Sequence, residues 1–147
     1  MRASQAMKKD VVFVNSMVSL CKVRRLMREF NIRHVPVVER GELVGMISDR
    51  DLLLASTLRD GRVDVPDVPA LTIMSRNVVT CFATSRVEDI AATMIRLQIS
   101  CIPVVLERRI LGIITTTDLL RLVSARSSVV TGFGNGTGID IDGLRSA

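Results

Sequence analysis

A long segment of this chain occurs twice, and the second copy follows the first at an offset of 67 positions without a gap. The matched stretches keep their order and their chemistry: 35–38 with 102–105, 44–45 with 111–112, and 51–53 with 118–120. An internal repeat of this length indicates two copies of one structural unit. The fold must therefore contain two similar units that pack on each other.

Each copy is predicted to form a strand, a helix, two further strands and a second helix. Short β-prone runs at 11–14 and 78–81 open the two copies. Apolar residues at helical spacing then indicate amphipathic helices, with Leu20, Val23, Met27 and Phe30 in the first copy and Val87, Ile90, Met94 and Leu97 in the second. The second helices are expected to run from near Ser48 toward Leu58 and from about Thr116 to Ser124.

The two central strands of each copy should form a hairpin, 35–38 with 43–47 in the first. Gly41 supplies the unusual backbone angle that a tight turn requires. The second copy has Arg108 at the matched position. We therefore predict that residues 106–109 close by another type of turn.

The repeat divides the chain into two units, residues 7–58 and 74–126, joined by a linker at 59–73 that is marked by Gly, Pro and alternating charge. Neither unit is large enough to bury its own sheet, so the two are expected to stack face to face about a pseudo-twofold axis. Residues 127–147 hold five glycines and few large apolar side chains, which predicts a flexible tail.

Composition excludes several classes of protein. No apolar run reaches the roughly 18 residues of a membrane span, and the first nine residues do not resemble a signal peptide, so we expect a cytoplasmic protein without membrane partners. Three scattered cysteines without CxxC spacing predict buried thiols and no metal site. The net charge of +5 favours an anionic ligand and is too diffuse to indicate nucleic acid.

An apolar-Pro-Val-Val strand, a Leu-Val-Gly or Leu-Gly return and a Ser/Thr-x-x-Asp-Leu-Leu helix entry follow one another in both copies. In this order they make residues 7–56 and 74–123 resemble the CBS-domain family, and the pair resembles a Bateman module. The resemblance implies an α/β (α+β) fold of two tandem β-α-β-β-α repeats, a CBS-domain pair. It also implies a regulatory module that binds an adenosine-containing ligand in the cleft between the repeats, such as AMP, ADP, ATP or S-adenosylmethionine.

Carried over position by position, the resemblance makes Asp51 and Asp118 the ribose ligands, with Ser48 and Thr115 as hydroxyl donors near ribose or phosphate. The strand entries would flank the adenine: Val35, Pro36, Ile102 and Pro103. A carboxylate can accept hydrogen bonds from both hydroxyls of a ribose, and bonds to a charged group contribute roughly 1.5–3 kcal/mol each. The same Ser/Thr-x-x-Asp pairs are also ordinary helix caps, which need no ligand, and one residue can serve both purposes.

Basic residues distinguish the first copy from the second. Arg50 would reach a phosphate as a fork-shaped donor, and Arg33 and His34 stand where some members of the family keep phosphate-binding residues. The matched residues of the second copy are uncharged: Thr117, Ser100 and Cys101. We expect the half of the cleft around Arg33, His34 and Arg50 to suit phosphates better.

No nucleophile–base arrangement, Walker loop or HExxH motif is present in the sequence, so we predict a non-catalytic protein that requires no cofactor. Apolar helix faces predict a homodimer with twofold symmetry, through Leu52, Leu53, Leu119, Leu120, Leu122 and Val123. The regulatory output would pass through a protein partner that the sequence does not identify. Two alternatives stay open: a ligand-free structural dimerisation module, and a nucleic-acid binder using Lys22, Arg24, Arg25 and Arg28.

Overall fold

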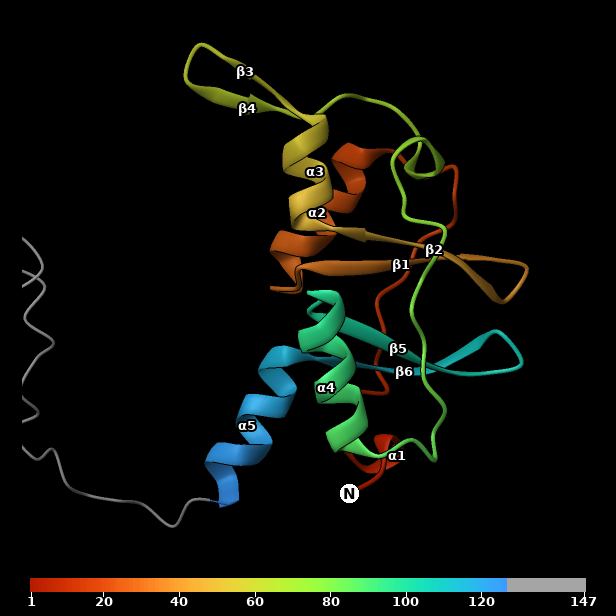
Figure 1. Ribbon diagram of the computed structural model, residues 1–147. Helices are drawn as coiled ribbons and strands as arrows, with labels where there is room; N and C mark the ends of the chain where they lie inside the picture. The colour runs from red at the N-terminus through yellow and green to blue at the C-terminus, as the bar shows by residue number, and fades with distance from the viewer. Residues whose placement is uncertain (127–147) are drawn as a thin grey trace, which may run out of the picture.

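The structure is a computed structural model that describes residues 1–126 (Figure 1). The tail prediction for 127–147 lies outside the described residues. The first half contains α1 (Ala3–Ala6), α2 (Leu20–Glu29), β1 (His34–Glu39), β2 (Glu42–Ser48) and α3 (Asp49–Ala55). A short hairpin of β3 (Thr57–Arg59) and β4 (Arg62–Asp64) and the 3-10 helix η1 (Ala70–Thr72) lead to α4 (Val87–Leu97), β5 (Cys101–Leu106), β6 (Arg109–Thr115) and α5 (Thr116–Arg126).

The two central hairpins are built alike. Strands β1 and β2 pair antiparallel from His34 opposite Ser48 to Glu39 opposite Glu42, and β5 and β6 pair from Cys101 opposite Thr115 to Leu106 opposite Arg109. Each hairpin carries one bulge, at the same position in the two registers. Figure 1 shows the hairpins next to each other, with α2 and α3 beside the first and α4 and α5 beside the second. The predicted fold class, two tandem repeats of mixed helix and strand, is confirmed.

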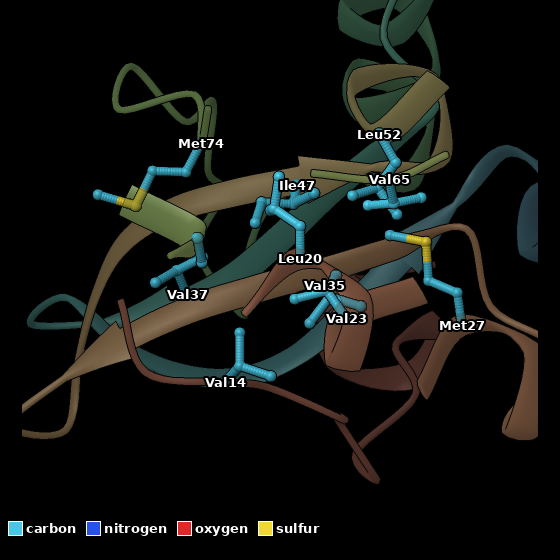
Figure 2. Packing of buried hydrophobic residues seen from close by; sticks show 11 residues of the cluster. Val14, Leu20, Val23, Met27, Val35, Val37, Ile47, Leu52, Val65 and Met74 are labelled. Atoms are coloured by element: carbon cyan, nitrogen blue, oxygen red, sulfur yellow. The ribbon is translucent and has the colours of Figure 1, made fainter. Parts of the chain in front are cut away.

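Each half has its own apolar core. Figure 2 shows the first, where Leu20 and Val23 of α2 pack against Val35, Val37 and Ile47 of the β1–β2 hairpin. The second core joins Ile90 and Met94 of α4 to three residues of the β5–β6 hairpin, namely Ile102, Val104 and Ile114. A third cluster of Met46, Cys101 and Ile113, with Val11 and Val78 packed against it, joins the two hairpins. The junction of the repeats therefore has a small apolar cluster of its own, between the two cores.

The segment that opens each repeat docks on the other repeat. Lys8 exchanges two backbone hydrogen bonds with Ile113 of β6, at 2.9 Å each, and Ser75 does the same with Met46 of β2, at 2.9 and 3.0 Å. We call residues 7–8 and 74–75 the arms. Ahead of the first arm, Ala3 of α1 is fully buried in the core of the second repeat. The arms therefore fasten the two repeats together, and each arm brings its side chains to the helix entry of the other repeat.

Several predicted elements differ in the structure. The runs 11–14 and 78–81 are not regular strands, because each makes a single parallel bridge, Val14 to Val37 and Cys81 to Val104. Helix α3 ends at Ala55 rather than near Leu58, because the chain turns there into the exposed β3–β4 hairpin. The segment predicted as a linker buries Val65 and Ala70 in the first core. Phe30 and Leu97, predicted to face inward, are exposed, because both stand at the ends of their helices.

The predicted difference between the two central turns is wrong. Arg40 and Gly41 have φ values of 50° and 78°, and Glu107 and Arg108 have 48° and 68°. Both hairpins thus close with two residues at positive φ, the pattern of a type I′ turn. Arg108 adopts a left-handed conformation that is costly for a residue with a Cβ, because the buried strands on either side fix the register.

Candidate functional site

A cavity of about 360 Å³ lies where the entry of α3 meets the second repeat. The first repeat contributes six residues: His34, Met46, Ser48, Asp49, Arg50 and Asp51. The second repeat contributes residues of two segments, 75–79 and 98–101: Ser75, Asn77, Val78, Val79, Gln98, Ile99, Ser100 and Cys101. We call this the Asp51 cavity. It combines two carboxylates, three serine hydroxyls and a guanidinium with an apolar wall of valine, isoleucine and methionine side chains.

A second cavity, of about 260 Å³, occupies the position related by the 67-residue offset. The entry of α5 contributes Thr115, Thr116, Thr117 and Arg121, and the other residues come mainly from the first repeat: Lys8, Asp10, Asn31, Ile32, Arg33 and His34. We call this the Asp118 cavity, after the carboxylate beside Thr115. Asp118 itself is 6% exposed and does not line the cavity. A further cavity of about 360 Å³ lies among α2, α3 and β4 and is lined by residues of the first half alone.

The two helix entries are capped alike but differ in their carboxylates. Ser48 N donates to Asp51 Oδ2 at 2.8 Å and Asp51 N donates to Ser48 Oγ at 3.1 Å, a reciprocal capping box. Thr115 N and Thr115 Oγ1 both donate to Asp118 Oδ2, at 2.9 and 2.7 Å. The capping interpretation of both pairs therefore holds in the structure. Asp51 is half-buried and lies at the wall of its cavity.

Asp118 makes ion pairs in addition to its cap. Lys8 Nζ lies 3.0 Å from Asp118 Oδ1, and Arg121 NH1 lies 3.7 Å from the same oxygen. Burial acts to raise the pKa of Asp118, but the hydrogen bonds from Thr115 and the charge of Lys8 outweigh it, so the pKa lies below its ordinary value. This carboxylate is ionised at neutral pH and already surrounded by donors.

His34 lies between the two cavities and lines both. Its Nε2 is 3.0 Å from Ser100 Oγ, so the hydrogen bond joins the first repeat to the second. Burial lowers the pKa of His34, and Arg33 adds to the shift, against the smaller opposing effects of Asp49 and Asp51. The imidazole is therefore neutral at pH 7 and acts as a hydrogen-bonding partner rather than as a cation.

The structure corrects the predicted grouping of basic residues. Arg50 lines the Asp51 cavity together with Ser100 and Cys101, whereas Arg33 lines the Asp118 cavity together with Thr117. The basic residues of the first repeat are thus divided between the two cavities, because each cavity takes its walls from both repeats. Neither half of the cleft is therefore built from residues of the first repeat alone.

The four residues predicted to flank an adenine are buried in the cores. Val35 is 0% exposed and Ile102 is 1% exposed, and the two prolines are equally inaccessible. None of these four residues lines either cavity. Their predicted role stays a prediction.

Sequence reasoning missed the contribution of the arms. Lys8 and Ser75 of the arms line the cavities, as do Asn77, two residues after the second arm, and Arg121 of α5. The signal that could have found Lys8 and Ser75 is their match at the same 67-residue offset as the rest of the repeat. A cation in one copy and a small hydroxyl in the other indicate two cavities of different chemistry.

Other chemistry is limited in the part of the chain that the structure describes. Among residues 1–126, no group of three or more His, Cys, Asp or Glu residues could hold a metal ion. Burial raises the pKa of Cys101 to about 12 and that of Cys81 to about 11, so these thiols stay protonated and unreactive. No helix in 1–126 has the length and apolar character needed to cross a bilayer.

A comparison with known proteins finds a family match over most of the chain. The sequence pattern of the CBS domain matches residues 3–57 and 70–125. The solved CBS domain pair of protein MJ0100, in complex with 5′-methylthioadenosine and S-adenosyl-L-methionine, is similar with a TM-score of 0.76 and 29% identity, over 86% of this chain and 98% of that one.

Two relatives differ in how much of their length is covered. The CBS domain-containing protein YhcV of Bacillus subtilis is 32% identical over 112 residues, which span 75% of this chain and 76% of YhcV. The L-aspartate semialdehyde sulfurtransferase of Methanocaldococcus jannaschii is 32% identical over 120 residues, 80% of this chain but only 22% of the enzyme. The match to the sulfurtransferase covers a minor part of that protein.

Proposed function

The chain belongs to the CBS-domain family, as a tandem pair of CBS domains, and we propose that it is a non-catalytic regulatory module that binds an adenosine-containing ligand in the Asp51 cavity. The observation that carries the proposal is the position of Asp51 at the wall of a cavity of about 360 Å³ between the repeats. This volume falls within the range of small-molecule sites, which place a few polar groups in a mostly apolar pocket.

Each part of an adenosine ligand has a suitable partner in this cavity. Asp51 Oδ2 accepts one backbone hydrogen bond from Ser48, which leaves Oδ1 for the hydroxyls of a ribose. Arg50 provides a guanidinium for a phosphate or carboxylate of the ligand. The side chains of Val78, Val79 and Ile99 provide an apolar wall for the base. The adenosine ligands in the MJ0100 domain pair support the same class of ligand here.

A thermal-shift panel tests this function. We expect AMP, ADP, ATP, S-adenosylmethionine, 5′-methylthioadenosine or NADH to raise the melting temperature, while GMP serves as the control for the base. A ligand present at a hundred times its dissociation constant stabilises the fold by about 2.7 kcal/mol. Asp51→Asn should abolish the shift, and its urea unfolding curve shows whether the fold is retained. If no adenosine compound shifts the melting temperature at millimolar concentration, the chain is a ligand-free structural module.

We also propose that the module acts as a homodimer. Leu53 and Leu54 of α3 are 61% and 76% exposed, and Leu120 and Val123 of α5 are 65% and 66% exposed. Leu52, which was predicted to join this face, is 5% exposed and belongs to the first core. Exposed apolar groups of this kind favour a protein interface. Light scattering at tens of micromolar should give the mass of two chains, and a monomer mass would contradict the proposal.

A further inference from the structure

The two cavities differ at the arms, although the arm backbones are held in the same way. Lys8 and Ser75 are matched by the 67-residue offset, and each exchanges a pair of backbone hydrogen bonds with the second hairpin strand of the other repeat. The direction from which each side chain enters its cavity is therefore fixed by the backbone. The long cation of Lys8 reaches the carboxylate of Asp118, and the matched position opposite Asp51 holds a short hydroxyl.

The state of the two carboxylates follows from this difference. Both oxygens of Asp118 are in use, Oδ2 by Thr115 and Oδ1 by Lys8 at 3.0 Å and Arg121 at 3.7 Å. Among residues 1–126, Asp51 makes no ion pair, and only its Oδ2 accepts a hydrogen bond. Asp118 is buried, whereas Asp51 is half-buried. Asp51 therefore has a carboxylate oxygen that is available to a ligand, whereas both oxygens of Asp118 already interact with groups of the protein.

A ribose at Asp118 would have to displace the lysine. A ribose offers two neutral hydroxyls, and hydrogen bonds between neutral and charged groups are weaker than those in which both partners are charged. Removing the cation from a buried carboxylate also leaves a charge without its partner in a region of low dielectric. Both effects act against a nucleoside in the Asp118 cavity, and neither applies at Asp51.

We propose that the chain binds one nucleoside ligand, in the Asp51 cavity, and that Lys8 closes the Asp118 cavity to ribose. This inference rests on the proposed function and adds the number of sites and the residue that sets it. Lys8 acts as a specificity-determining residue. Lys8 belongs to the arm that begins the first repeat, and this arm docks on the second repeat. One side chain therefore leaves only one of the two matched cavities able to bind ribose.

The repeat supplies its own matched variants. Lys8→Ser gives the first arm the residue of the second, and Ser75→Lys gives the second arm the residue of the first. Calorimetric titration with 5′-methylthioadenosine, which carries a ribose and no phosphate to compete for Lys8, should give one site per chain in the parent protein. Lys8→Ser should give two sites, and Ser75→Lys should weaken binding by roughly tenfold or more, in line with the loss of a bond to a charged group. AMP is titrated in parallel.

A second pair of variants keeps the test decisive if Lys8→Ser does not fold. Asp51→Asn and Asp118→Asn preserve the shape of the side chain, and only the first should weaken the single site of the parent. Two equal sites in the parent protein, or a site lost in Asp118→Asn and kept in Asp51→Asn, would overturn this inference and leave the proposed function standing. An absence of binding by both compounds would overturn both.

Discussion

The Asp51 and Asp118 cavities are formed by matched backbone segments of the two repeats but are lined by different side chains. Both lie at the junction of the repeats, and the hairpins that lead to them share their register and their bulge. At Asp51 the facing arm contributes Ser75, and at Asp118 it contributes Lys8. A duplicated fold can therefore keep the same packing in both halves while the side chains that line its two cavities differ.

The largest expected effects should be equal in the two repeats. Ile47 and Ile114 occupy matched positions and are both 0% exposed. Ile47→Ala and Ile114→Ala should each lower the free energy of unfolding by about 2–5 kcal/mol, because each removes buried methyl groups and leaves a cavity. Urea unfolding of both variants measures this. A large loss in only one of them would show that the two cores are not equivalent.

The next comparison separates the two arms. A Cβ on Gly112 would lie 2.7 Å from the backbone oxygen of Lys8, whereas the closest atom to a Cβ on Gly45 is the flexible Sδ of Met74, at 2.5 Å. Gly112→Ala should destabilise by about 1–3 kcal/mol, because the backbone of the arm must move, and Gly45→Ala should cost less. Thermal unfolding measures both losses. Equal losses of stability in the two variants would mean that both arms adjust to the added methyl group at the same cost in free energy.

A smaller effect should appear at the turn of the second hairpin. Arg108 has φ of 68° without being glycine, whereas Gly41 takes this place in the first hairpin. Arg108→Gly should raise the free energy of unfolding by roughly 1 kcal/mol, because it removes the steric cost of the left-handed conformation. The gain is reduced by loss of the ion pair between Arg108 and Glu42, whose N–O distance is 3.3 Å and which is exposed and therefore weak. A loss of stability in urea unfolding would contradict the strain argument.

The smallest expected effect is a pH dependence at the contact between the cavities. Burial lowers the pKa of His34 below its ordinary value of 6.5. As the pH falls through that value the unfolded chain binds a proton before the folded chain does, so stability is present above about pH 6.5 and is lost as the medium becomes more acidic. His34→Gln should reduce the difference in urea midpoint between pH 7.5 and 5.5. An unchanged difference would exclude His34 as its source.

The features that could be predicted from the sequence are those fixed by local pattern. The spacing of Leu20, Val23 and Met27 predicted the buried face of α2. The apolar runs 35–38 and 43–47 on either side of a short turn predicted the first central hairpin, and the repeat predicted the second. The Ser/Thr-x-x-Asp pairs predicted the helix entries, because capping is settled by residues three positions apart. These elements follow from neighbouring residues, and the structure contains them.

The features that could not be predicted depend on contacts between distant segments. Nothing near Lys8 in the sequence indicates that it docks on Ile113. Because each arm docks on the other repeat, each cavity takes its walls from both repeats, and Arg33 and Arg50 line different cavities. The sequence of one repeat could therefore not show which of its residues share a cavity. At Arg108 the local preference for glycine predicted a different turn, and the register of the buried strands overrode it.

The most direct test of the account is a titration of the ¹⁵N-labelled chain with AMP, followed through its backbone amide signals. The signals of Asp51, Ser75 and Asn77, around the Asp51 cavity, should shift on binding. The signals of Lys8 and Thr117, around the Asp118 cavity, should stay in place. Shifts confined to Lys8 and Thr117, or no shifts at saturating AMP, would contradict an adenosine site at Asp51.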